Sequence, residues 1–328
     1  MHKRTLLISV LLVLAAGLFA VYGVETLRMS GGKTRQIAVI MKSGDIRSEF
    51  WQTFGEGVKA AAKRFDVNAE IAGPLSESDA DGQIKAVNEA IAKKPDAIVL
   101  AATDEAKLKP SVDKIKKAGI KLVSVDTASN AGATESVIAT DQTEAGKRAG
   151  LHLAGQLTAN ASKAFILKSA NGAAEAAERE EGVRAALSGS PQAEYIGTFT
   201  SEGTEDRAYE TAKLLLASHS DVKGIVCLNE KMTLGAARAI KEKALTGEIK
   251  LIGFDSSIYI VKLLEEGVVQ ATVVQKPFNM GFLSIKSAVQ LLSGIKANPK
   301  QYVESLVITK DNMYSQQNQQ LLFPIVER

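Results

Sequence analysis

Residues 97–104 read Ala-Ile-Val-Leu-Ala-Ala-Thr-Asp, a short apolar run that gives way to polar side chains. No polar residue interrupts Ala97 to Leu100, so the run predicts a strand that is covered on both faces, as in a parallel sheet. Segments of helical period flank it, Ser78 to Lys93 before and Ala106 to Lys117 after. A buried strand between two such helices is typical of an α/β fold.

The same alternation extends in both directions along the chain. Strands are predicted at 37–41 and 68–71, with a helix between them that ends near Phe65, and at 121–125. A second series follows, with strands at 163–167, 194–199, 224–228 and 250–254, and helices at 143–157, 174–187, 204–218 and 232–242. The sequence therefore predicts two doubly wound parallel-sheet lobes.

Polar residues follow the predicted strands at their carboxyl ends, where open parallel sheets bind ligands. Such residues also cap helices, because the first amides of a helix need acceptors. We assign four of them to capping: Thr103, Asp104, Ser256 and Glu230. The first polar residue after a strand, such as Asp126, Asn229 or Asp255, is expected to contact a ligand instead.

The composition excludes some classes of protein. The 328 residues carry 40 basic and 37 acidic side chains, for a net charge of +3, and these are spread along the chain, so no nucleic-acid surface is expected. The single cysteine, Cys227, cannot form an internal disulfide or a thiolate metal cage, and its apolar surroundings predict a buried side chain. We predict no metal and no cofactor.

The N-terminus resembles an export signal. His2, Lys3 and Arg4 precede the uncharged residues 5–24. A signal-peptide core has ~7–15 apolar residues and a spanning helix ~20, so residues 1–24 are a signal peptide or a membrane anchor, and both alternatives stay open. Residues 25–35 are polar and are expected to be a linker. The rest of the chain should therefore be extracytoplasmic, either periplasmic or anchored to the outer face of the cytoplasmic membrane.

Phe50 and Trp51 are adjacent near the start of the first predicted helix. Neighbouring helical residues point about 100° apart, so a packed core has no particular use for such a pair. Burial in a core therefore does not explain why the two residues are adjacent.

Several stretches form one pattern in order and spacing. They are Ser-Glu-Phe-Trp at 48–51, residues 79–83 and 94–100, Ala-Thr-Asp-Gln at 139–142 with Gly146, Glu-Arg-Glu-Glu-Gly at 178–182, residues 228–236, Gly-Phe-Asp at 253–255, and Val-Gln-Lys-Pro at 274–277 with Gly281. From about Gln36 to Thr309 the chain resembles the periplasmic sugar-binding proteins of the ribose-binding type, which are type I periplasmic binding proteins that serve ATP-driven (ABC) importers.

The resemblance implies a three-strand hinge, with crossings near Thr140, Gln275 and Glu304. One lobe would comprise residues 36–140 and 276–304, and the other residues 141–275 and 305–328, behind an N-terminal hydrophobic helix. It further implies that a sugar is held between the lobes. The positions that match ligand contacts are Ser48, Phe50, Trp51, Asp126, Thr127, Asn229, Asp255 and Gln275.

Departures from the family pattern bear on the ligand. Two positions at which relatives carry sugar-binding arginines hold Thr127 and Ala177, and Ala101 replaces an asparagine. These changes remove planar bidentate donors. A longer turn brings Lys42 and neighbouring charges near the site. We therefore expect a small neutral polyhydroxy ligand, or one with a positive charge, rather than an acidic sugar.

Other functions are less well supported. The carboxylates Asp126 and Asp255 permit a glycosidase, in which two acids flank the scissile bond. In this fold, however, such acids accept hydrogen bonds from hydroxyl groups, and the histidines and serines form no catalytic motif. A DNA-binding regulator with the same core would carry a headpiece where this chain has its export segment.

Two uses of ligand binding remain. The chain is expected to be a monomer that delivers its ligand to the permease of an ABC importer; the alternative is a sensor that signals to a membrane histidine kinase or chemoreceptor. Hinge closure serves both equally.

Overall fold

The computed structural model describes residues 34–126, 134–158, 161–170 and 174–322. The chain divides into two compact units, residues 1–35 and 36–328, and the second contains both sheets. The predicted export segment, residues 1–24, lies outside the described residues. Within the described ranges, no helix combines the length and apolar character needed to span a membrane.

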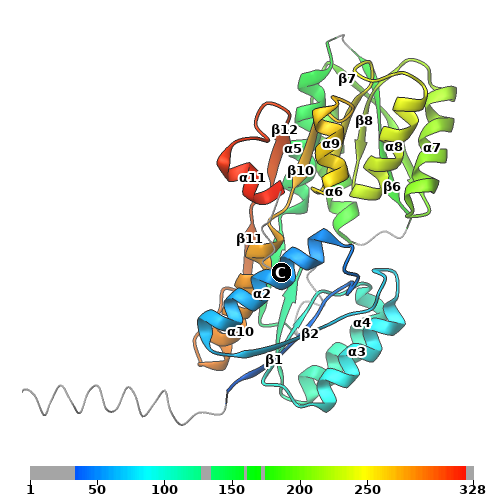
Figure 1. The fold of residues 1–328 in the computed structure, drawn as a ribbon. Coiled ribbons are helices and arrows are strands. Elements are labelled where there is room, and N and C mark those ends of the chain that lie inside the picture. Colours follow the sequence, from blue (N-terminus) through cyan, green and yellow to red (C-terminus); the bar gives the residue numbers. More distant parts are fainter. Residues whose placement is uncertain (1–33, 127–133, 159–160, 171–173, 323–328) are drawn as a thin grey trace, which may run out of the picture. The chain divides into compact units, whose positions relative to one another are not determined.

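The first sheet has the strand order β11-β5-β4-β3-β1-β2, and all its neighbours pair in parallel. Its strands are β1 (Gln36–Ile40), β2 (Asn68–Ala72), β3 (Ala97–Leu100), β4 (Lys121–Val125), β5 (Ser136–Thr140) and β11 (Lys300–Val303). Helices α2 (Glu49–Phe65) and α10 (Pro277–Leu292) cover one face, and α3 (Ala80–Ala92) and α4 (Glu105–Lys117) cover the other (Figure 1).

The central strands of this sheet are largely apolar because both their faces are buried. Along β1, Ile37 and Val39 enter the core under α2 and α10, while Ala38 and Ile40 enter the core under α3 and α4. Successive strand residues point to opposite faces, so each face receives every second side chain.

The second sheet has the order β12-β10-β9-β8-β6-β7, with only β12 antiparallel to its neighbour among these pairs. Its strands are β6 (Ser162–Ser169), β7 (Ala193–Ser201), β8 (Val222–Cys227), β9 (Lys250–Phe254), β10 (Ala271–Val274) and β12 (Leu306–Thr309). Its helices are α5 (Gln142–Gln156), α6 (Ala174–Ser188), α7 (Glu205–Ser218), α8 (Glu230–Glu242), α9 (Ile258–Glu265) and α11 (Gln316–Leu322). The two parallel-sheet lobes predicted from the sequence are confirmed.

The chain passes between the sheets three times. It leaves the first sheet after Thr140 and enters α5, returns after Val274 into α10, and crosses again between β11 and β12. Each sheet thus contains the same order of connections, with β1 corresponding to β6 and β4 to β9. The residues of the candidate site follow the carboxyl ends of strands in both sheets.

Close helix packing fixes the position of α2, which carries Phe50 and Trp51. A Cβ atom at Gly57 would lie 2.0 Å from the carbonyl oxygen of Phe278 in α10, and one at Gly281 would lie 2.1 Å from that of Phe54. Only glycine permits this approach of the two backbones. The start of α2 is therefore held rigidly at the end of β1.

Candidate ligand-binding site between the lobes

Two aspartates occupy corresponding positions in the two lobes. Asp126 follows β4 and Asp255 follows β9, and both adopt the left-handed conformation, with φ of 68° and 73°. The backbone N–H of Asp126 donates to the carbonyl of Ile138 at 2.9 Å, and that of Asp255 to the carbonyl of Val273 at 3.0 Å. The backbone amide of each aspartate thus continues the hydrogen bonding of the sheet, while its left-handed conformation changes the direction of the chain at the end of the strand.

Lys42 follows β1 and is buried, with 3% of its surface exposed. Its Nζ lies 2.6 Å from Oδ2 of Asp126 and 2.8 Å from Oε1 of Glu175, which stands in the first turn of α6 in the second lobe. Burial opposes the ammonium charge, but the two carboxylates outweigh it and raise the pKa of Lys42 above its usual range. The lysine is therefore a permanent cation that contacts both lobes.

Asp255 is held by the backbone and by the hinge. Its Oδ2 accepts a hydrogen bond from the N–H of Glu230 at 3.2 Å, and its Oδ1 lies 3.5 Å from Nε2 of Gln275. Burial raises the pKa of Asp255, while Arg179 acts in the opposite direction. Burial likewise raises the pKa of Glu230 to about 7. The carboxyl groups of Asp255 and Glu230 therefore keep their protons to a higher pH than free carboxyl groups do.

Gln275 joins two of the crossings between the lobes. Its Oε1 accepts hydrogen bonds from Oγ1 of Thr140 at 2.9 Å and from Nε2 of Gln142 at 3.3 Å. The side chain is buried, so these bonds are shielded from water. Gln275 thus connects the hinge directly to Asp255.

The two adjacent aromatic residues differ in burial. Trp51 is 2% exposed and packs edge to face against Phe50 at 4.9 Å and Phe54 at 5.5 Å between ring centroids. Its indole N–H donates to Oε1 of Glu77 at 2.7 Å. Phe50 is only half-buried, so its ring is the one of the pair that a ligand can reach. Ser48 is the N-cap of α2, yet its side chain makes no capping bond.

Arg179 has a structural role in the second lobe. Its Nε donates to Oε1 of Gln142 at 2.8 Å, one guanidinium nitrogen donates to the carbonyl of Leu228 at 2.7 Å, and the group lies 4.4 Å from the ring centre of Phe254. These contacts fix α6 to the ends of β8 and β9.

The assignment of helix caps from the sequence was partly wrong. Asn229, rather than Glu230, caps α8 through a bond from the N–H of Met232 to its Oδ1 at 3.0 Å, and Ser257, rather than Ser256, caps α9. Asp104 caps α4 as predicted, but Thr103 does not. The error arose because each of these two helices begins one residue away from the expected position. The Oδ1 of Asn229 therefore already accepts one hydrogen bond within its own lobe.

The structure places Asp126 and Asp255 close enough for their charges to interact, and Glu77, which accepts the indole N–H of Trp51, lies near both. Gln275 bonds Asp255, whereas Thr127 lies outside the described residues. The sequence did not single out Glu77 or Glu175, and it placed Lys42 only near the entrance. We call the charged residues of this region the interlobe cluster: Lys42, Glu77, Asp126, Glu175, Arg179, Glu230 and Asp255. Carboxylates outnumber cations in it.

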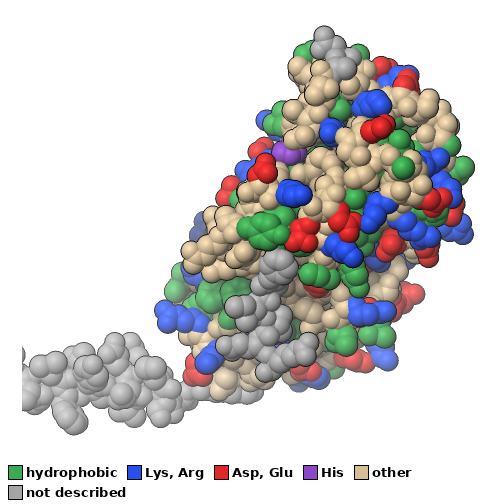
Figure 2. Space-filling view, turned by 45° about the horizontal axis from the view of Figure 1, so that its top comes forward, with side chains coloured by type: hydrophobic (Ala, Val, Ile, Leu, Met, Phe, Trp, Pro, Cys, Tyr) green, Lys and Arg blue, Asp and Glu red, His purple; other side chains and the backbone are tan. Residues whose placement is uncertain are grey.

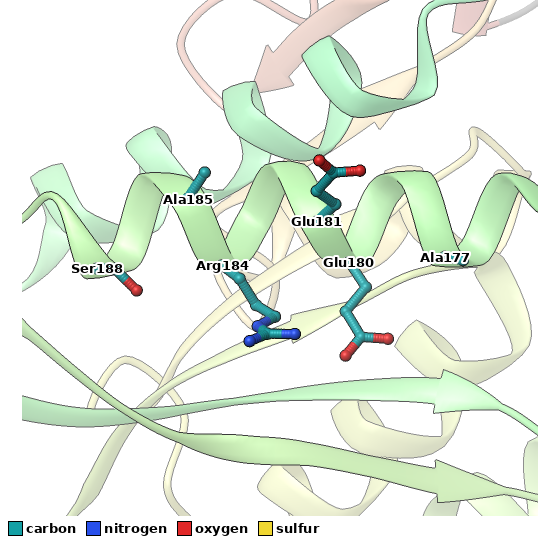
Figure 3. A pocket seen from close by; sticks show the side chains of 6 residues that line it. All are labelled: Ala177, Glu180, Glu181, Arg184, Ala185 and Ser188. Carbon is teal, nitrogen blue, oxygen red and sulfur yellow. The ribbon is translucent and has the colours of Figure 1, made fainter.

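A separate hollow on α6 carries no comparable arrangement (Figure 3). It is lined by Ala177, Glu180, Glu181, Arg184, Ala185 and Ser188. Glu180 points toward the sheet, where it accepts hydrogen bonds from Lys168 at 2.6 Å and Thr198 at 2.8 Å. Because the Glu180 carboxylate already accepts hydrogen bonds within its own lobe, it has little capacity left to bind a ligand in this hollow.

Other kinds of site find no support in the described residues. Across these ranges, no three or more His, Cys, Asp or Glu side chains are grouped so that they could hold a metal ion. Cys227 is fully buried, as predicted. On the face shown in Figure 2, basic and acidic side chains are interspersed, unlike the basic stripe of a nucleic-acid interface.

Two α/β lobes that the chain crosses three times, with an aspartate at the corresponding strand end of each, are the architecture of a two-lobe binding protein. Residues 37–296 match the family model described as periplasmic binding protein domain, and the chain belongs to this family. The family consists of binding proteins rather than enzymes.

Two related proteins are named for the sugars that they bind. The D-ribose/D-allose-binding protein of Pseudomonas aeruginosa is 27% identical over 267 residues, which cover 79% of this chain and 82% of the relative. The D-allose-binding periplasmic protein of Escherichia coli is 24% identical over 288 residues, covering 84% and 92%.

Solved structures agree with this assignment. A carbohydrate transporter solute-binding protein from Agrobacterium radiobacter, in complex with D-arabinose, has a TM-score of 0.81 and 27% identity, and the match covers 88% of this chain and 99% of that one. A sugar transporter from Clostridium phytofermentans has a TM-score of 0.75 and 33% identity, covering 85% and 100%.

Proposed function

We propose that this chain is an extracytoplasmic substrate-binding protein that captures a small neutral polyhydroxy ligand, a sugar, and delivers it to an ABC importer. Closure of the two lobes about the hinge would trap the ligand, and the closed form would dock on the permease. The names of the relatives support the sugar class and the importer.

The observation that carries this proposal is the pair of left-handed aspartates, one from each lobe. Carboxylate oxygens are strong acceptors for hydroxyl groups. Because Asp126 and Asp255 come from different lobes, a ligand that bonds both favours the closed arrangement over the open one, and this is what closure by ligand requires. Gln275 lies in the hinge and bonds Asp255, so a ligand that contacts Asp255 would also influence the relative position of the lobes.

The charges of the site favour a neutral ligand over an acidic one. Lys42 is the ammonium nearest to Asp126, and two carboxylates already neutralise it. Arg179 is occupied by Gln142 and the carbonyl of Leu228. An anionic sugar would thus meet excess negative charge with no free cation among these residues.

We assign the ligand contacts to Ser48, Phe50, Asp126, Thr127, Asn229, Asp255 and Gln275, whereas Trp51, which matches a ligand contact in sequence, is buried and acts through Phe50. Phe50 would pack against the C–H face of the sugar ring, with Trp51 as its support. Residues 1–24 would direct export, either as a cleaved signal or as an anchor on the outer face of the membrane.

The test is thermal denaturation of the purified chain with pentoses, hexoses, polyols, amino sugars and nucleosides. A ligand at a hundred times its dissociation constant adds about 2.7 kcal/mol to the free energy of unfolding, which raises the melting temperature by several degrees. A shift with one sugar class would support the proposal. No shift with any compound, in protein with a cooperative melt, would refute it.

Asp255→Asn provides the matched variant. Asparagine tolerates the left-handed backbone and keeps the shape of the side chain, but it removes the charged acceptor, so affinity should fall about 10–100-fold. Asp66→Asn is the control, because Asp66 also has a positive φ of 53° and is exposed at the end of α2. It should bind as the wild type does.

A further inference from the structure

The contact between Lys42 and Glu175 joins the lobes at a distance from the hinge. Lys42 follows the first strand of one lobe, and Glu175 lies in the first turn of α6 in the other. Among the described residues, the other ion pair that reaches across, Arg148 with Glu304, lies at the crossing between β11 and β12. Separation of the lobes would therefore break the Lys42 contact first.

Both partners retain bonding capacity. An ammonium has three N–H donors, and the Nζ of Lys42 uses two on Asp126 and Glu175. The Oε2 oxygen of Glu175 is buried and has no hydrogen-bond partner among the described residues. A buried carboxylate oxygen without a donor is unfavourable, so a group that supplies one would be bound.

A hydroxyl group fits both requirements at once. Its oxygen accepts the third N–H of Lys42, and its proton is donated to Oε2 of Glu175. No other common sugar group can do both, because a carbonyl oxygen cannot donate and an ammonium cannot accept. The pair is therefore suited to one hydroxyl of a polyhydroxy ligand.

Without Lys42, the acidic residues on the two lobes near this contact would repel each other. Glu105 at the start of α4 lies near enough to Glu175 and Glu178 of α6 for their charges to interact, and burial together with Glu175 raises the pKa of Glu105. Asp126 adds a further negative charge on the first-lobe side. The ammonium of Lys42 thus offsets a repulsion that would otherwise favour the open arrangement.

We propose that Lys42 and Glu175 form an ionic latch that holds the lobes together and recognises one hydroxyl of the ligand. Glu175 is a specificity-determining residue in this arrangement, although it stands on a helix remote in sequence from the other contacts. The recognition of a hydroxyl rests on the proposed function, whereas the latch does not.

Glu175→Gln tests the latch in the full chain without ligand. Nitroxide labels at Lys117→Cys in α4 and Glu210→Cys in α7, both exposed, report the distance between the lobes by double electron–electron resonance. Cys227 is fully buried and will not take up the label. The variant should shift the distance distribution toward longer values than the wild type shows.

Glu180→Gln is the matched control. Glu180 lies on the same helix, with its side chain 16% exposed against 17% for Glu175, and it pairs at 2.6 Å with Lys168 of its own lobe. It should leave the distances unchanged. Equal distance distributions in Glu175→Gln and wild type, or an equal shift in both variants, would overturn the latch.

Titration calorimetry with the sugar found in the panel tests the recognition. Glu175→Gln should weaken binding about tenfold, and one monodeoxy analogue should bind wild type and variant with equal affinity, because it lacks the hydroxyl that Glu175 accepts. Unchanged affinity in the variant, or a tenfold loss that persists with every deoxy analogue, would overturn it. If no sugar binds the wild type, the proposed function fails, and the distance measurement still decides the latch.

Discussion

Replacing Lys42 by methionine should destabilise the first lobe strongly. The ammonium lies 2.6 Å from Asp126, and the two side chains are 4% and 8% exposed. Methionine fills a similar volume but leaves a buried carboxylate without its partner, and removing one member of a buried ion pair typically costs about 3–5 kcal/mol. We expect the melting temperature to fall on the order of 10 °C.

A second substitution distinguishes the charge from the packing. In Lys42→Met/Asp126→Asn the more deeply buried of the two carboxylates is removed together with the ammonium, and only Glu175, which is 17% exposed, keeps its charge. Asparagine also tolerates the left-handed backbone, so most of the lost stability should return. Lys59→Met is the surface control, because its bond to Glu56 is 2.8 Å long while the lysine is 67% exposed. Such a pair contributes about 0–1 kcal/mol.

The assay is thermal denaturation followed by circular dichroism, with the wild type, Lys42→Met, Asp126→Asn, the double variant and Lys59→Met compared in one buffer. The reasoning fails if Lys42→Met melts within about a degree of the wild type, because the buried pair would then contribute no more than a surface pair. It also fails if the double variant is as unstable as the sum of the single losses, since that would assign the effect to packing.

Three further predictions concern single residues. Because the pKa of Glu230 is raised from 4.5 to about 7, the folded state holds a proton that the unfolded chain releases, and the free energy of unfolding should fall by roughly 1–3 kcal/mol between pH 5 and pH 8. Glu230→Gln should flatten this decline in urea denaturation at the two pH values, and an unchanged slope would contradict the assignment. Gly57→Ala should lower the urea midpoint markedly, because the added Cβ would lie 2.0 Å from the carbonyl of Phe278, whereas Gly155→Ala, which meets nothing within 4 Å, should be neutral or stabilising by up to about 1 kcal/mol. Cys227 should react with a thiol reagent only after unfolding, since it is fully buried and burial raises its pKa; rapid reaction of the native protein would refute this.

The sequence predicted the central strands best. The runs at 97–100, 121–125 and 250–254 have the same bounds as β3, β4 and β9, because strands buried on both faces consist of uninterrupted apolar residues. The edge strand β11 gave no such run, since its residues alternate between exposed and partly buried positions. Its place in the sheet depends on pairing with β5, which lies far away in the sequence.

The candidate site was predictable where it depends on strand ends. Asp126 and Asp255 were found because each follows a buried strand directly. Lys42 also follows such a strand, and that signal was available, but the contact with Glu175 spans 133 positions and joins a strand end to a helix. Only the relative placement of the lobes brings them together, and no local pattern encodes it.

The matched backbone of Asp126 and Asp255 has a consequence for how this protein can change over evolutionary time. Two lobes with the same strand order each place one residue with a φ near 70° at the end of the corresponding strand. Most side chains would lose about 1–2 kcal/mol there, and only glycine, asparagine and aspartate are readily tolerated. New ligand preferences should therefore arise through neighbouring positions such as Lys42 or Glu175, while these two aspartates vary little among descendants.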